Sequence, residues 1–414
     1  MNNRWVQLGA SVVAMVMIAN LQYAWTLFVV PLQEGNGWEL TPVQWAFTLF
    51  VLFQTWVQPL DGWLIDRLGP RWFITLAGVF TGVGWAAIGS ASTLTQLYVF
   101  YCTAGVGAAL VYSGSVGSAL KWFGDRRGLA AGIIAAGFGS GTALFIPVIR
   151  YLIDNFGYRT AFLATGIFQG VVIVAVAQLL RHPQADSQAR PAAAKAAGRN
   201  RRNAEHFTTW EMLRTPHFYA LYVMFVAMST GGLLATAQAG PLVRAWGLPL
   251  AALTAATTLS PVANGASRIF WGWISDRIGR ENTMVIAFFL QAVCLLGVLT
   301  LGRTSSVWFT VTLALTFFTW GEIYALFPAT SGDWFGARHA TSNYSFLYTA
   351  KGVASILAGG AAAFLYQLLG DWSAAFYGSA ALALLASVMA AVLRAAPLPS
   401  KALAAPAPSL EALR

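Results

Sequence analysis

The segment GWLIDRLG (residues 62–69) recurs 210 positions later as GWISDRIG (residues 272–279). A second segment, KWFGDRR (residues 121–127), recurs 212 positions later as DWFGARH (residues 333–339). Both matches have nearly the same offset, which indicates that the chain consists of two related halves in the same orientation. The fold is therefore expected to contain one structural unit twice.

The composition is typical of a membrane protein. Of the 414 residues, 57% are hydrophobic and only 10% are charged, whereas soluble proteins average about 25% charged residues. The 17 Trp, 27 Phe and 40 Gly residues suit a helical bundle with aromatic residues at the membrane surfaces and close contacts between helices. We therefore expect an all-α protein that crosses a lipid bilayer.

Apolar stretches of about 20 residues, long enough to cross a bilayer, occur throughout the chain. They predict twelve transmembrane helices, at residues 5–30, 43–65, 72–91, 94–120, 128–152, 160–180, 217–243, 250–275, 283–302, 306–332, 340–368 and 372–394. The longest connection is rich in Ala and Arg and is expected to be a solvated linker. The predicted organisation is an N-terminal six-helix lobe (1–180), a cytoplasmic linker (181–214), a C-terminal six-helix lobe (215–396) and a cytoplasmic tail (397–414).

The 25 Lys and Arg residues are unevenly distributed across the predicted membrane. If the N-terminus is cytoplasmic, nineteen lie on the cytoplasmic side, Arg268 and Lys351 lie within spans, and four lie on the opposite side, namely Arg150, Arg159, Arg244 and Arg303. Cytoplasmic loops of membrane proteins carry an excess of Lys and Arg, so both termini are expected in the cytoplasm. This topology explains the net charge of +10, and no nucleic-acid partner is expected.

Lys351 lies near the middle of the apolar run that contains NYSFLYTAKGVASI (residues 343–356). A lysine at the centre of a membrane helix costs about 2.5–3.5 kcal/mol, so a compensating group is expected. A small anion between Lys351 and Arg268 would be held by an ammonium and a guanidinium. The alternatives are an internal salt bridge for Lys351 and, for Arg268, a side chain that extends to the cytoplasmic surface.

Glu322 is the one acidic residue that we identify deep within an apolar span. Three interpretations are open: a protonatable coupling site, a structural partner of Arg268 or Lys351, and a neutral buried acid. At about 100° per residue, Glu322 points roughly 160–200° away from Trp320 and Tyr324. If those two rings line a cavity, Glu322 faces a neighbouring helix.

Aromatic and amide side chains could enclose an anion near these cations. Tyr348 precedes Lys351 by three residues and therefore lies on the same helical face. Its hydroxyl can donate a hydrogen bond to a carboxylate. The predicted substrate-binding residues are Arg268, Lys351, Gln22, Tyr23, Tyr112, Trp320, Tyr324 and Tyr348. For each aromatic residue, the alternative is packing in the core or at the membrane surface.

The two GWxxDRxG segments resemble the signature loops of the major facilitator superfamily. That resemblance implies two six-helix lobes with a substrate site between them. It also implies that Asp66 and Arg67, and more weakly Asp276 and Arg277, form a conformational latch at the cytoplasmic side. The second copy departs from the pattern, and the alternative for both copies is a simple charged turn.

Four further segments resemble the oxalate/formate antiporter branch of that superfamily: residues 211–222, 268–280, 316–336 and 343–360. The resemblance covers nearly the whole chain, and it implies that Arg268 and Lys351 bind a dicarboxylate. It predicts exchange of oxalate for formate by a monomer in a bacterial inner membrane. The alternatives are a proton-coupled monocarboxylate symporter, which Glu322 would suit, and a carboxylate sensor that does not transport.

The sequence contains no recognisable catalytic site. We find no phosphate-binding Gly-Lys-Ser/Thr loop, no plausible catalytic triad and no cluster of metal ligands, and the two cysteines, Cys102 and Cys294, lie far apart in apolar runs. We therefore expect no enzyme activity, no cofactor and no metal site.

Overall fold

The computed structural model describes residues 3–123, 127–181, 201–336 and 338–401, without the side chains of residues 62–70, 120–121, 127–129 and 131. Every regular element in these ranges is a helix. The first half contains α1 (Arg4–Tyr23), α2 (Trp25–Asn36), α3 (Leu40–Trp56), α4 (Gln58–Ile88), α5 (Leu94–Trp122), α6 (Arg127–Ser140) and α7 (Thr142–Ala177). The second half contains α8 (Thr209–Leu213), α9 (Pro216–Ala245), α10 (Leu250–Ile278), α11 (Arg280–Thr300), η2 (Gly302–Thr304), α12 (Ser306–Trp320), α13 (Ile323–Phe335), α14 (Ala340–Ile356), η3 (Leu357–Ala361), α15 (Ala362–Leu369) and α16 (Ser373–Ala395).

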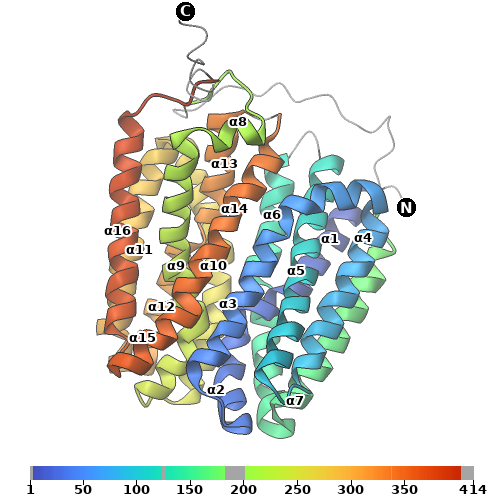
Figure 1. Ribbon diagram of the computed structural model, residues 1–414, viewed down its shortest axis with the longest axis vertical. Helices are drawn as coiled ribbons and strands as arrows, with labels where there is room; N and C mark the ends of the chain where they lie inside the picture. Colours follow the sequence, from blue (N-terminus) through green and yellow to red (C-terminus); the bar gives the residue numbers. More distant parts are fainter. Residues whose placement is uncertain (1–2, 124–126, 182–200, 337, 402–414) are drawn as a thin grey trace, which may run out of the picture.

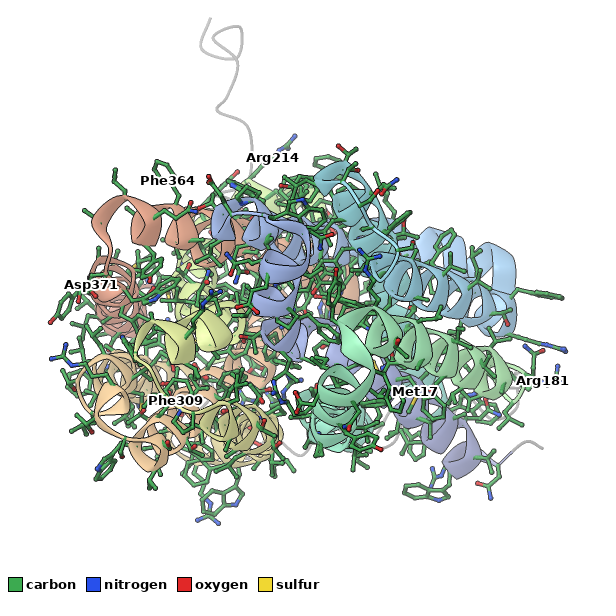
Figure 2. The ribbon with its side chains drawn as sticks, turned by 90° about the horizontal axis from the view of Figure 1, so that it is seen from below. Met17, Arg181, Arg214, Phe309, Phe364 and Asp371 are labelled. Carbon is green, nitrogen blue, oxygen red and sulfur yellow. The ribbon has the colours of Figure 1, made fainter. Side chains whose placement is uncertain are left out.

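These helices form two bundles that lie side by side (Figure 1). We call α1–α7 the first lobe and α9–α16 the second lobe. Both chain termini lie toward the upper end of Figure 1, which we call the termini end, and α2 and α15 lie at the opposite, far end. Seen from below, Met17 and Arg181 lie on the side of the first lobe, and Phe364 and Asp371 on the side of the second (Figure 2).

Ten helices in the described ranges are long and apolar enough to cross a membrane. One of them, Gly132–Ala177, contains two predicted spans, which meet at the bend at Gly157, where φ is 80°. α10 is not among the ten because buried polar residues such as Asn264 and Arg268 lower its hydropathy. If the bent helix is counted as two spans and α10 is added, the described helices account for the twelve predicted spans. The exact limits of the predicted lobes stay a prediction.

Three spans are interrupted beside the predicted site residues. α1 ends at Tyr23 and α2 begins at Trp25; α12 ends at Trp320 and α13 begins at Ile323. α14 passes into the π-helix η3 six residues after Lys351. Irregular backbone at membrane depth is tolerated where protein buries it or where it borders a cavity. The breaks therefore mark the middle of the bundle as the place to look for a site.

Hydrogen bonds join the two lobes at the far end. The side-chain amide of Gln44 on α3 donates to the carbonyl oxygen of Ala237 at 2.8 Å and to the side chain of Gln238 at 3.0 Å, both on α9. The backbone N–H of Gly240 donates to the hydroxyl of Thr26 on α2. A route from the centre of the bundle to the far end is therefore shut by these contacts.

The described part of the predicted linker is bonded to the second lobe. Arg202 forms an ion pair with Asp333 at 3.3 Å, and Asn343 donates to the carbonyl oxygen of Phe207 at 3.1 Å. The side chain of Thr208 caps α8. The pKa of Glu211 is lowered, mainly by the hydrogen bond from the backbone N–H of Thr208 and next by the hydrogen bond from Lys401. Residues 201–214 are thus bonded to the second lobe, and the predicted role of 181–214 as a linker stays a prediction.

Gly240→Ala is expected to prevent full closure of the far end. A Cβ at this position would lie 2.3 Å from the carbonyl oxygen of Thr26 in the other lobe, and overpacking of this kind costs about 1–3 kcal/mol. Spin labels at Glu34 and Arg244, which form an ion pair of 3.2 Å across this end, would report it. In a background without Cys102 and Cys294, the variant should add a population with a longer distance between the labels.

Gly9→Ala is the matched control for this prediction, because a Cβ at Gly9 would meet nothing within 4 Å. It should leave the distance distribution unchanged. An identical distribution in Gly240→Ala and the parent protein would show that this contact does not hold the far end closed.

Candidate functional site

Lys351 on α14 is fully buried and hydrogen-bonded across the boundary between the lobes. Its ammonium nitrogen donates to the amide oxygen of Gln22 on α1 at 2.7 Å, to that of Gln54 on α3 at 3.1 Å, and to the hydroxyl of Tyr348 at 3.3 Å. An ammonium group has three protons to donate, so each has an acceptor. All three acceptors are neutral, and two belong to the first lobe.

Arg268 on α10 also connects the two lobes. One terminal nitrogen of its guanidinium donates to the carbonyl oxygen of Ala135 on α6 at 2.9 Å, and the other donates to the side-chain oxygen of Asn264 at 3.0 Å. The guanidinium carbon lies 4.4 Å from the ring centroid of Tyr324, a cation–π contact. Arg268 is 4% exposed. The ammonium of Lys351 lies 5.7 Å from the centroid of the same Tyr324 ring, so the two cations lie against one ring.

Six aromatic rings form a closed circuit beside the cations, which we call the aromatic cage. Three come from the first lobe and three from the second: Tyr23, Tyr112, Phe138, Trp320, Tyr324 and Tyr348. Successive ring centroids around the circuit are 5.6 to 6.3 Å apart, and Tyr112 and Tyr348 are stacked across the boundary between the lobes at 5.7 Å. The ammonium of Lys351 lies 5.4–5.8 Å from the ring centroids of Phe138, Tyr324 and Tyr348.

The structure therefore brings all eight predicted substrate-binding residues together between the lobes. Several hydrogen-bond donors at the site are buried without a partner: the amide nitrogens of Gln22 and Gln54, the Nε of Arg268, the indole nitrogen of Trp320 and the hydroxyls of Tyr23 and Tyr324. A buried donor without an acceptor costs about 1–3 kcal/mol. Oxygen-rich, negatively charged groups carry the acceptors that suit such a set of donors.

Glycines on neighbouring helices make room for these side chains. The indole of Trp320 lies directly on Gly232 of α9, where a Cβ would be 1.9 Å from the ring. Gly139 of α6 faces Arg268 of the other lobe, with the site of a Cβ 3.3 Å from the guanidinium Nε. At the break before α13, a Cβ on Gly321 would be 2.0 Å from the hydroxyl of Ser267. Each of these glycines permits an approach that a larger residue would block.

Glu322 does not pair with either cation. Its side chain is fully buried, and neither carboxylate oxygen has a hydrogen-bond partner in the part of the chain that the structure describes. The interpretation of Glu322 as the structural partner of Arg268 or Lys351 is therefore wrong for this conformation, because both cations are bonded to other groups instead. A coupling site and a neutral buried acid remain open.

The predicted latch is described only in its second copy, since the side chains of Asp66 and Arg67 lie outside the described residues. Asp276 forms an ion pair of 2.8 Å with Arg280, and Arg277 lies 3.8 Å from the ring centroid of Trp273. Arg280 is also paired with Asp333 at 3.2 Å. These contacts lie within the second lobe, and the role of the latch stays a prediction.

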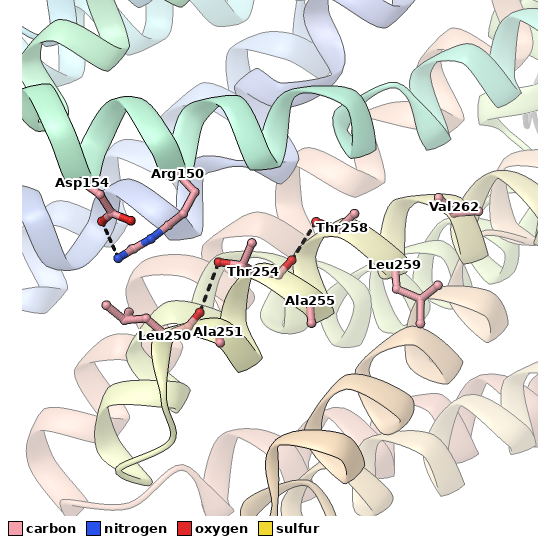
Figure 3. A pocket seen from close by; sticks show the side chains of 9 residues that line it. All are labelled: Arg150, Asp154, Leu250, Ala251, Thr254, Ala255, Thr258, Leu259 and Val262. Atoms are coloured by element: carbon pink, nitrogen blue, oxygen red, sulfur yellow. Dashed lines mark hydrogen bonds and ion pairs between the residues drawn. The ribbon is translucent and has the colours of Figure 1, made fainter.

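A groove between the two lobes is not the site of this chemistry. It has a volume of about 690 Å³ and lies between α7 and α10 (Figure 3). Its polar side chains are satisfied internally: Arg150 pairs with Asp154 at 2.5 Å, and Thr254 and Thr258 donate to carbonyl oxygens of their own helix. The remaining lining residues are mostly apolar, and none of the predicted substrate-binding residues is among them.

Sequence reasoning missed three residues of the site and one other buried acid. Gln54 and Asn264 bond the cations, Phe138 completes the aromatic cage, and Asp61 is buried in the predicted span 43–65. A signal for Gln54 and Asp61 was available: Gln54, Gln58 and Asp61 are polar residues at helical spacing in an apolar run. Phe138 and Asn264 give no such signal, because a Phe or an Asn in a membrane helix has several common roles.

Comparison with known proteins adds three findings. The family model of the Major Facilitator Superfamily matches residues 10–321 and 219–413. The chain is 37% identical to the oxalate:formate antiporter of Oxalobacter formigenes, over 94% of this chain and 91% of that protein. It is 28% identical to an uncharacterized 38 kDa protein of Thermoproteus tenax (93% of this chain, 94% of the other) and 25% identical to monocarboxylate transporter 12 of Xenopus laevis (85% and 80%).

Gly232→Ala is expected to destabilise the protein by about 1–3 kcal/mol, because the added methyl group would overlap the ring of Trp320. Thermal unfolding in detergent would measure the loss. In a Trp320→Ala background the overlap is gone, so the same change at Gly232 should cost little. Equal effects of Gly232→Ala in both backgrounds would contradict this contact. Gly378→Ala, with nothing within 4 Å of the added carbon, is the control.

Proposed function

The chain belongs to the major facilitator superfamily and, within it, to the oxalate/formate antiporter family, and we propose that it exchanges oxalate for formate by alternating access. Oxalate:formate antiport is the activity named for the relative from Oxalobacter formigenes. In this proposal the substrate anion binds between Arg268 and Lys351 inside the aromatic cage.

The set of buried, unpartnered donors around the two cations is the observation that carries this proposal. A carboxylate offers two oxygens with about four acceptor positions, and oxalate offers two such groups. The free Nε of Arg268 and the amide nitrogens of Gln22 and Gln54 are donors that these oxygens can satisfy. A carboxylate carries a full negative charge, which attracts the ammonium more strongly than the partial charge of an amide oxygen does. An anion therefore competes well with the amide oxygens that hold Lys351.

The cations also explain why transport would be an exchange. Without an anion, Lys351 is bonded to Gln22 and Gln54, and Arg268 to Ala135, so each cation links the second lobe to the first. The lobes can rock only if these links break, and breaking them without replacement leaves buried cations unpaired. A bound anion supplies replacement acceptors. The loaded carrier can therefore change sides, and the empty one is held.

We further propose that the protein acts as a monomer in a bacterial inner membrane with both termini in the cytoplasm. The 19-to-4 distribution of Lys and Arg supports this orientation. The far end, closed by Gln44 and Thr26, would then face the outside.

Uptake of labelled oxalate into proteoliposomes tests the proposal. Vesicles are loaded with formate, with oxalate or with buffer alone, each with and without a pH gradient. Exchange predicts rapid uptake into the formate-loaded and oxalate-loaded vesicles and none above background into empty ones. Uptake into empty vesicles at the same rate would contradict it.

Lys351→Gln is expected to lower oxalate exchange by about 100-fold or more, since loss of one partner of a buried charge pair costs about 2–5 kcal/mol. Lys351→Arg keeps the charge and should retain part of the activity. Lys401→Gln, which removes an exposed lysine paired with Glu211, is the matched control and should exchange normally. Normal exchange by Lys351→Gln, at equal protein content, would remove Lys351 from the binding site.

Proton-coupled uptake of a monocarboxylate is the second candidate function. The buried, unpaired carboxyl of Glu322 favours it, and a relative is named as a monocarboxylate transporter. In such a protein, Glu322 would take up a proton for each substrate carried. The two functions share the cationic site and differ in what drives net movement.

Glu322→Gln distinguishes the two candidates. If the protein is an exchanger, the variant should exchange oxalate within about twofold of the parent, because Glu322 bonds neither cation and glutamine has nearly the same shape as glutamic acid. If it is a proton symporter, an inward proton gradient should drive formate uptake into empty vesicles, and Glu322→Gln should abolish that uptake. Loss of exchange in the variant without any proton-driven uptake in the parent would contradict both assignments of Glu322.

A further inference from the structure

A second buried acid lies on the termini side of the cage. Gln54, Gln58 and Asp61 follow one another at spacings of four and three residues, so they form a polar row on one face of the span that α3 and α4 share. All three are buried, and Asp61 is 2% exposed. Gln54 accepts a hydrogen bond from Lys351, so the row begins at the site and leads away from it.

The pairing of α3 with α14 shows where the row leads. The two helices are antiparallel at the boundary between the lobes (Figure 1). Thr48 and Ser355 exchange hydrogen bonds, and Gln54 bonds Lys351 closer to the termini end. Asp61 lies seven residues beyond Gln54, about 10 Å along a helix. If the two spans continue side by side in this antiparallel register, Asp61 lies beside the turn of α14 that precedes Tyr348.

The contacts of Asp61 connect it to the cage. Ser113 on α5 donates to one carboxylate oxygen of Asp61, and the other oxygen has no partner among the described residues. The residue before Ser113 is Tyr112, which stacks on Tyr348 of the other lobe. Asp61 is therefore bonded to the residue of α5 that follows Tyr112, one of the two rings stacked across the boundary between the lobes.

Other buried polar groups without partners lie on the same side of the cage. They come from both lobes: the hydroxyls of Ser115 and Ser118 on α5, of Thr330 and Ser331 on α13, and of Tyr344 on α14. A dry, permanently packed boundary would leave these groups unsatisfied in every state, at a cost for each one. The presence of these hydroxyls at the boundary is explained if the lobes separate on this side and water enters between them.

We propose that these hydroxyls line the route of the substrate to the termini end and that Asp61 is a proton-controlled gate on that route. With its proton, Asp61 is neutral and lets a carboxylate pass; without it, the aspartate repels the carboxylate. The proton comes from water at the termini end when the lobes are open there. This inference rests on the proposed carboxylate exchange and assigns its dependence on pH to one residue.

Few other charged groups on the helices packed against this region could produce the same effect. α14 contributes Tyr344, Tyr348 and Lys351, and α5 contributes Tyr98, Tyr101, Cys102 and Tyr112, with Lys121 outside the described side chains. α3 carries no titratable residue. On α7 the titratable groups are Arg150, Tyr151, Asp154, Tyr158 and Arg159, which lie toward the far end. In the rest of α4, Asp66 and Arg67 have no described side chains, and Arg71 bonds Gln178 on α7.

The test is oxalate self-exchange in proteoliposomes, with equal oxalate and equal pH on both sides, from about pH 5 to about pH 8. The parent protein should exchange about tenfold more slowly at the alkaline end, because like charges repel strongly in a site of low polarity. Asp61→Asn carries no charge at any pH and should keep the faster, acidic rate throughout. Asp154→Asn removes a carboxylate of the far-end groove and should follow the parent.

The outcomes separate the gate from the exchange itself. If the parent does not exchange oxalate at any pH, the proposed function fails. If it exchanges and Asp61→Asn keeps the pH dependence of the parent, the gate alone is contradicted. If Asp61→Asn folds poorly, Ser113→Ala takes its place in the test, because it loses the donor that stabilises the ionised carboxylate of Asp61. The pH at which exchange by this variant slows should be higher than in the parent. An unchanged pH of slowing contradicts the gate.

Discussion

Two buried cations without an acidic partner are the constraint on which this structure depends. In the described conformation, Arg268 and Lys351 donate to neutral oxygens, most of them in the opposite lobe, and the Nε of Arg268 has no partner. Neutral acceptors offset the loss of water around a charge less well than an anion does. These neutral acceptors hold the cations in place and leave them available to bind an anion. It makes the boundary between the lobes both the binding site and the element that resists rocking.

The rest of the fold supports this site. Helix breaks beside Tyr23 and Trp320 bring rings from both lobes into one cage, and Gly232 and Gly321 allow the close packing that positions Trp320 and α10. The far end is closed by a few hydrogen bonds between the lobes. The termini side of the cage contains hydroxyls and a carboxyl without partners among the described residues.

Much of this organisation can be predicted from the sequence, because the free energy of burying a charge within a membrane span is large. A lysine or arginine within an apolar span is expensive enough to stand out, and the internal repeat fixes the division into lobes. The partners of these cations cannot be predicted in the same way. Gln54 and Ala135 reach them from the other half of the chain, and which helices meet is decided by packing. For Glu322 the prediction failed in the opposite direction. Its charge predicted an ion pair with Arg268 or Lys351, and the structure does not contain that pair.

Asp61 was overlooked for a related reason. It lies at the end of a predicted span, where an acid is normally solvated, and only the packing of α5 and α14 reveals that it is buried. Phe138 has no distinguishing feature in a glycine-rich span, although its ring completes the cage. In both cases the role arises from neighbours distant in the sequence.

A structure of the protein with oxalate bound would test the central claim most directly. The account predicts one carboxylate within hydrogen-bonding distance of the Nε of Arg268 and the ammonium of Lys351, enclosed by the aromatic cage, with Gln22 and Gln54 no longer accepting from Lys351. Oxalate bound elsewhere, with the bonds of Lys351 to Gln22 and Gln54 intact, would contradict it.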